Sequence, residues 1–99
     1  MIYNYFENEK KLLYYEHGAD KIPDEVIAEF SDKDVTNIDF SSNALVSLDC
    51  ISHFSSLKEV IFDNNFLSDV SVFPKKKFPN IIVLSLNKNK VKMMKLSCM

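Results

Sequence analysis

Apolar residues recur along this 99-residue chain in three segments that share one layout. In each segment the first, fourth, sixth and eleventh positions are apolar, and the ninth is asparagine. The segments read VTNIDFSSNAL, LKEVIFDNNFL and IIVLSLNKNKV in chain order. Their asparagines, Asn43, Asn65 and Asn89, are separated by 22 and then by 24 residues. A period of this length indicates stacked structural units, because such a unit buries its apolar face only against its neighbours.

Each segment is expected to begin with a short strand of a parallel sheet. Ile38 and Phe40 alternate toward the core with a period of two, while Asn37 and Asp39 point outward. The asparagine follows where the chain turns inward. Its amide both donates to and accepts from backbone groups that would otherwise be buried without a partner. We therefore expect Asn43, Asn65 and Asn89 to stack as a ladder.

The segments that return the chain to the next strand are also patterned. Behind the first asparagine, apolar residues follow at a strict three-residue spacing, which favours a 3₁₀ or short helical turn on the outer face: Leu45, Leu48, Ile51, Phe54 and Leu57. The second return begins in the same way with Leu67, Val70 and Phe73. It then breaks at PKKKFP, where two extra residues are expected to bulge outward.

A degenerate unit precedes the first full one. When the layout of the first full segment is moved 23 residues toward the N-terminus, its four apolar positions and its asparagine position fall on Leu12, Tyr15, His17, Asp20 and Ile22. IPDEVIAEF then predicts a short outer helix, opened by Pro23 and with Val26, Ile27 and Phe30 inward. The expected organisation is an N-terminal extension (1–11), either an edge strand or disordered, a degenerate capping unit (12–34), two full units (35–56 and 57–80) and an incomplete third (81–99).

This layout resembles the leucine-rich repeat proteins of the short, 22-residue class. The resemblance implies an α/β solenoid, a right-handed superhelix of strands and α or 3₁₀ turns, with about four units here. Within the class, LKEVIFDNNFLSD followed by FPNIIVLSLNKNKV is similar to the family of leucine-rich melanocyte differentiation-associated proteins, which read LEEL-x-LDNN and then TLTLNKN. IDFSSNALVSLDCISHFSSL is also similar to that family's LDLSFNxLxSLxGLxxFxSL. The similarity spans residues 12–92, and the family pattern continues past LNKN into another strand.

The family resemblance implies a role in melanocyte differentiation and melanosome biogenesis, with a Rab-type small GTPase as partner. The alternative within the same class is a regulatory subunit or adaptor of a phosphatase or ribonucleoprotein complex. Both are non-catalytic protein-binding functions. Neither requires a cofactor.

Composition indicates where in the cell this single domain is expected and which partners it excludes. No apolar run approaches the roughly 20 residues of a membrane span, and the N-terminus does not have the pattern of a secretory signal. Two cysteines, Cys50 and Cys98, are too few for a disulfide framework, so we expect a cytoplasmic protein, with the nucleus as a second possibility.

Residues 1–69 hold all fourteen carboxylates and five lysines, a net charge of −9, whereas residues 70–99 carry +7. The chain has no arginine, which argues against nucleic acid as a partner.

The outward strand positions form the natural binding surface of such a solenoid. Acids dominate the early strands and give way to Ile61 and Val83, which suits a partner with a basic rim and an apolar contact. The alternative is a solvated face whose acids maintain solubility. The predicted partner-binding residues are Tyr14, Glu16, Asn37, Asp39, Glu59, Ile61, Asp63, Val83 and Ser85, with Ser41 and Asn87 on the same face.

Two other patterns suggest chemistry that the sequence does not support. Asp39, Glu59 and Asp63 lie on neighbouring strands, but nothing supplies the six or more oxygens that calcium takes, so no metal is expected. Cys50 and His53 share one face of a turn as a nucleophile and base would, but no third group orients them, so no catalytic residue is predicted.

The lysine-rich end of the chain is expected to be a solvated face rather than a lipid or nucleic-acid site; its lysines are Lys75, Lys76, Lys77, Lys88, Lys90, Lys92 and Lys95. Gly18 is the only glycine, so there is no glycine-rich phosphate loop. We expect a monomer. End-to-end association would use the open edge at 81–86.

Overall fold

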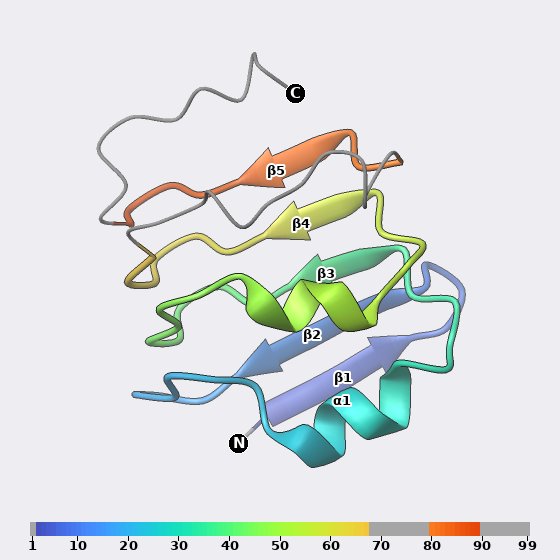
Figure 1. Ribbon diagram of the computed structural model, residues 1–99, viewed down its shortest axis with the longest axis horizontal. Helices are drawn as coiled ribbons and strands as arrows, with labels where there is room; N and C mark the ends of the chain where they lie inside the picture. The colour runs from blue at the N-terminus through green and yellow to red at the C-terminus, as the bar shows by residue number, and fades with distance from the viewer. Residues whose placement is uncertain (1, 68–79, 90–99) are drawn as a thin grey trace.

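A computed structural model describes residues 2–67 and 80–89 of the chain (Figure 1). They form an α/β fold around one five-stranded mixed sheet, with strands in the order β1-β2-β3-β4-β5. The strands are β1 (Ile2–Phe6), β2 (Lys11–Tyr15), β3 (Asn37–Asp39), β4 (Glu59–Ile61) and β5 (Val83–Ser85). β2 to β5 are parallel neighbours, whereas β1 runs antiparallel to β2.

Two helical segments cover one face of this sheet. The α-helix α1 (Asp24–Phe30) buries Val26, Ile27 and Phe30, as the spacing in IPDEVIAEF predicts. The 3₁₀ helix η1 (Asp49–His53) lies within the segment whose apolar residues recur every third position, and it buries Ile51. Both predictions are confirmed. The core lies between these helices and the sheet.

The centre of the core is a row of aromatic rings contributed by successive parallel strands. The Phe40 ring contacts Tyr14 edge-on at 6.3 Å between centroids and Phe62 at 5.6 Å. Phe40 is 0% exposed. Edge-to-face aromatic pairs add stabilisation beyond the burial of their area, so this row ties three strands together from within.

β1 resolves the alternatives left open for residues 1–11. IYNYF forms a hairpin with β2, closed by hydrogen bonds from the Glu9 and Lys10 amides to the carbonyls of Phe6 and Glu7. On its inner face, Tyr3 and Tyr5 contact the Phe30 ring of α1 at 5.9 and 5.3 Å. The segment is therefore an edge strand that is packed onto the helical layer.

The predicted alignment of residues 12–22 on the repeated template is wrong by three residues. Leu12 pairs with Ile38, 26 residues later, rather than lying level with Val35. The loop that follows keeps this 26-residue offset. The hydrogen bond from the Ala44 amide to the Ala19 carbonyl corresponds to the bond from the Phe66 amide to the Leu45 carbonyl between the next two turns. β2 accordingly buries Leu12 and Tyr14, not Tyr15 and His17. The physical reason is the hairpin, because pairing with β1 and burial beside Phe40 fix which side of β2 faces the core.

The predicted bulge at PKKKFP, Lys75–Lys77 and the C-terminal lysines from Lys90 onward lie outside the described residues, as do Val70 and Phe73. The unit boundaries and the leucine-rich repeat solenoid stay predictions. Among the helices of the described residues, none is long and apolar enough to cross a membrane.

Candidate functional site: an exposed sheet face above an asparagine ladder

Asn65 connects the turn after β4 to the turn after β3. Its Nδ2 donates to the carbonyls of Phe62 and Phe40, both at 2.9 Å, and more weakly to that of Asp63 at 3.2 Å. Its Oδ1 accepts from the Leu45 amide at 3.0 Å. The side chain is buried, so these contacts satisfy backbone groups that water does not reach.

Asn89 repeats the arrangement one strand further along. It donates to the carbonyls of Leu86 and Phe62 and accepts from the Leu67 amide. The three asparagines thus stack through the structure, each bonded to its own turn and to the preceding one.

Asn43 forms the first rung in a modified way. It donates to the carbonyls of Phe40 and Tyr14, but its Oδ1 accepts from the Glu16 amide at 2.7 Å. The donor to Asn65 is the Leu45 amide, and the residue 26 positions before Leu45 is Ala19. The donor to Asn43 is instead the amide of Glu16. The loop after β2 therefore reaches the ladder through a different residue, Glu16.

The parallel strands β2 to β5 present one exposed sheet face. The register places two columns across β2 to β5 on this face: Lys11, Asn37, Glu59 and Val83, and Leu13, Asp39, Ile61 and Ser85. Neighbouring strands lie about 4.8 Å apart, so members of a column are within side-chain reach of one another. Of the predicted partner-binding residues, Asn37, Asp39, Glu59, Ile61, Val83 and Ser85 are brought together here.

Tyr14 does not belong to this face, which corrects its prediction as a partner-binding residue. The side chain is 1% exposed and packs on Phe40. Its hydroxyl donates to the Glu16 carboxylate at 3.2 Å, and burial, followed by this hydrogen bond, raises the pKa of Tyr14 to about 12. Glu16 lies half-buried in the loop after β2, outside the columns. The cause is the three-residue error in alignment, which exchanged the two faces of β2.

Residues that the sequence reasoning missed extend the face at its β1 end. Lys11 and Leu13 occupy the column positions predicted for Tyr14 and Glu16. Beyond them, Ile2 and Phe6 of β1 pair with Tyr15 and Lys11. Ile2 is 56% exposed and Phe6 43%. A signal for β1 was present, since aromatic and polar residues alternate in IYNYF as in a strand.

Carboxylates on the face are held by neighbouring side chains. The Asp39 carboxylate accepts from the Ser41 hydroxyl at 2.7 Å and from the Ser41 amide at 3.1 Å. The Asp63 carboxylate accepts from the Ser85 hydroxyl at 2.6 Å and the Asn87 amide at 2.9 Å. These contacts fix the positions of both carboxylates.

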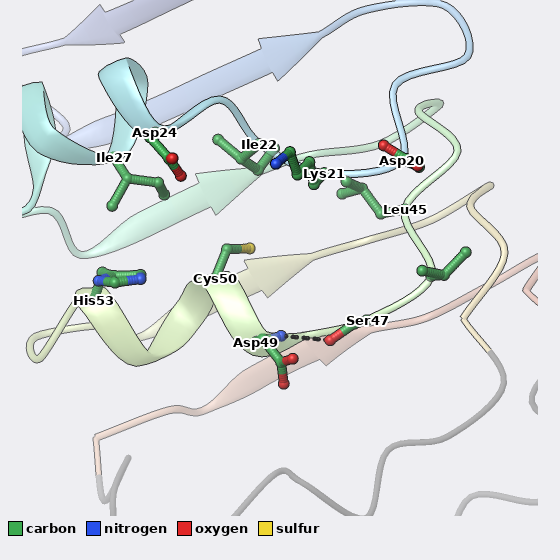
Figure 2. Close-up of a pocket in the computed structure, with 11 residues that line it drawn as sticks. Asp20, Lys21, Ile22, Asp24, Ile27, Leu45, Ser47, Asp49, Cys50 and His53 are labelled. Carbon is green, nitrogen blue, oxygen red and sulfur yellow. Dashed lines mark hydrogen bonds between the residues drawn. The ribbon is translucent and has the colours of Figure 1, made fainter.

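A second concave site lies on the helical side of the sheet. A cavity of about 400 Å³ opens between α1 and η1, and Figure 2 shows Asp24 and Ile27 of α1 across from Cys50 and His53 of η1. Burial raises the pKa of the Cys50 thiol to about 12. A thiol in that state is a poor nucleophile at neutral pH, because the thiolate is the reactive form.

This pKa gives an expected pH dependence for Cys50. In a Cys98→Ser chain, where Cys50 is the sole cysteine, alkylation by iodoacetamide at pH 8 should be at least about 100-fold slower than in the urea-unfolded chain. Since the folded pKa is raised, the rate should keep rising with pH through pH 11. Mass spectrometry of timed samples measures both rates. A native rate within threefold of the unfolded rate would contradict the desolvated thiol.

Within residues 2–67 and 80–89, no group of three His, Cys, Asp or Glu side chains is placed to hold a metal ion. Asp39, Glu59 and Asp63 lie on the exposed face but do not form such a group. No family model, no curated protein and no solved structure matches this chain.

Proposed function

We propose that this chain is a non-catalytic protein-binding module of the leucine-rich repeat type, and that the exposed sheet face is its binding surface. The observation that carries the proposal is the column of Leu13, Asp39, Ile61 and Ser85, which sets aliphatic side chains directly beside a fixed carboxylate. The repeated sequence template and the stacked asparagines support the repeat assignment.

The face has the two components that protein interfaces combine. Ile61 and Leu13 lie half-buried at its middle, and apolar residues in that position contribute most when a partner covers them. Asp39 and Asp63 provide charge that steers a basic partner and sets its orientation. Since Ser41, Ser85 and the Asn87 amide already hold these carboxylates, little side-chain entropy is lost on binding.

The family resemblance suggests where to look for the partner. A Rab-type small GTPase, acting in pigment-cell differentiation, is the first partner that we propose to test. The proposal requires that the partner present a basic rim around an apolar contact.

Affinity purification from pigment-cell extract with the full chain as bait identifies the partner, and binding of the purified partner is then measured by calorimetry. We expect Ile61→Lys and Asp39→Lys each to weaken affinity by about tenfold or more, since central contacts of an interface dominate its energy. Recovery of a phosphatase catalytic subunit or a ribonucleoprotein in place of a GTPase would favour the alternative partner class.

Matched variants on the helical side control for added charge and for folding. Asp32→Lys makes the same charge change as Asp39→Lys, and Ala28→Lys adds a lysine to the exposed side of α1. Both should bind as the unsubstituted chain does. Unchanged affinity of Ile61→Lys and Asp39→Lys together would refute the exposed sheet face as the binding surface.

A further inference from the structure

Both end strands of the sheet are open edges among the described residues. There, β1 pairs only with β2, and β5 pairs only with β4. An open edge presents unpaired N–H and C=O groups to other chains, and proteins usually block it with lysine, proline or a bulge. Ile2–Phe6 contains no charged residue and no proline, and it pairs with β2 through five consecutive residues without a bulge. The β1 edge therefore has none of these protecting features.

The outward backbone groups of β1 are those of its two tyrosines. In β4, the Ile61 carbonyl accepts from an amide on the β3 side. Leu13 holds the same register position in β2, so its backbone groups face β1, where Asn4 lies opposite. Because backbone groups alternate in direction along a strand, Tyr3 and Tyr5 direct their amides and carbonyls away from the sheet.

The β5 edge is open in the same way. The Ser85 carbonyl accepts from an amide on the β4 side, so the backbone groups of Leu84 face outward. Ile82, just before β5, is 79% exposed. Ile2 and Phe6 provide exposed apolar surface at the β1 edge, so a contact between the two edges would cover apolar side chains from both.

The two ends of the sheet belong to segments of opposite charge. Residues 1–34, which include β1, β2 and α1, hold nine carboxylates and four lysines, a net charge of −5 with histidine neutral. Residues 70–99, which include β5, hold seven lysines and no carboxylate. Opposite charges favour an interface and like charges disfavour it. The β1 end of one copy is therefore complementary to the β5 end of another copy, and not to a second β1 end.

We propose that this protein associates end to end with further copies of itself, with β1 of one copy paired antiparallel to β5 of the next. The direction follows from the fold. β1 runs opposite to β2 through β5, so a second copy stacked in the same orientation brings its β1 antiparallel to β5. Since the contact joins two different surfaces, it does not close on itself, and linear oligomers form as the concentration rises. The monomer expected from the sequence is then the dilute form.

Sedimentation velocity of the full chain tests this from about 10 µM to about 1 mM, because an edge-to-edge contact is small and therefore weak. The weight-average mass should rise from that of the 11.5 kDa monomer and pass that of two chains without a plateau. Raising NaCl from about 20 mM to about 500 mM should weaken association by about fivefold or more, since the exposed charges at the two ends are then screened.

Two variants each block one edge. Tyr3→Pro removes an outward amide from β1, a position where an edge strand tolerates proline, whereas Tyr3→Ala removes the phenol and keeps the amide. Ile82→Glu places an acid where the β5 end meets the acidic end of the next copy. Tyr3→Pro and Ile82→Glu should each stay monomeric alone. Their equimolar mixture should form a dimer and nothing larger, because one intact edge of each kind remains.

The controls separate blocked edges from lost folding. Tyr3→Ala should associate as the unsubstituted chain does. Circular dichroism checks that each variant is folded. Ile2→Lys leaves every backbone amide in place and serves as a second block of the β1 edge, so it should also weaken association.

The inference would be overturned by a monomeric mass up to about 1 mM, or by a mass that stops at two unsubstituted chains, which would indicate a closed dimer. It would also be overturned by blocked variants that associate as the unsubstituted chain does, or by a mixture of the two that stays monomeric. The inference goes beyond the proposed function, since Ile61 lies on the inner strand β4. Ile61→Lys should therefore associate as the unsubstituted chain does, whether or not it loses a partner.

Discussion

Replacing Asn65 with alanine is expected to lower the free energy of unfolding by about 3–4 kcal/mol. The substitution leaves the buried Leu45 amide without its side-chain acceptor. It also removes one of the two asparagine donors to each of the Phe40 and Phe62 carbonyls, which keep their bonds from Asn43 and Asn89. A domain of this size is stable by only about 5–15 kcal/mol, so the loss is a large fraction of the total. Urea unfolding followed by circular dichroism measures it.

Asn87→Ala is the matched control. Asn87 is exposed, and among the described residues its side chain donates only to the Ser85 hydroxyl, at 3.3 Å. The same truncation should therefore cost less than about 0.5 kcal/mol. Equal unfolding midpoints for the two variants would show that the buried hydrogen bonds of Asn65 do not stabilise the fold.

Tyr14→Lys is expected to abolish stable folding, at a cost above about 4 kcal/mol, because it places an ammonium group in the core beside Phe40. Tyr15→Lys, one residue along, should change stability by less than about 1 kcal/mol, since Tyr15 lies on the exposed face opposite Ile2. Thermal unfolding of both variants measures the difference.

This pair decides the register of β2. If residue 14 faced the partner-binding surface, as the sequence pattern alone predicts, Tyr14→Lys would be the tolerated change and Tyr15→Lys the damaging one. Tyr14→Phe serves as a further control, since it keeps the ring against Phe40 and should stay folded.

Sequence reasoning was most successful where one residue type has one physical role. α1 followed from the spacing of Val26, Ile27 and Phe30, and η1 from apolar residues at every third position. The asparagines were singled out because a buried turn needs a group that both donates and accepts. In each case the local pattern and the tertiary environment require the same residue.

It failed where two alignments of β2 had similar apolar content. Leu12, Leu13, Tyr14 and Tyr15 are all compatible with burial, so alternation did not select a face. The choice depends on pairing with β1 and on the ring of Phe40, and both are contacts between distant segments. The cavity between α1 and η1 was missed for a similar reason, because the residues that line it come from separate stretches of chain.

The asparagine ladder has a direction. The side chains of Asn65 and Asn89 each accept a hydrogen bond from an amide of the preceding turn and donate one to a carbonyl of that turn. The asparagine side chain of the preceding turn makes no such bond to the turn that follows it. Opening the β5 end therefore exposes the Leu67 amide and the Phe62 carbonyl to solvent, while the rungs of Asn65 and Asn43 stay closed. The hydrogen bonds of the ladder can therefore be lost in sequence from the β5 end, one asparagine at a time. At the other end, β1 and β2 form a hairpin, and its two strands separate together.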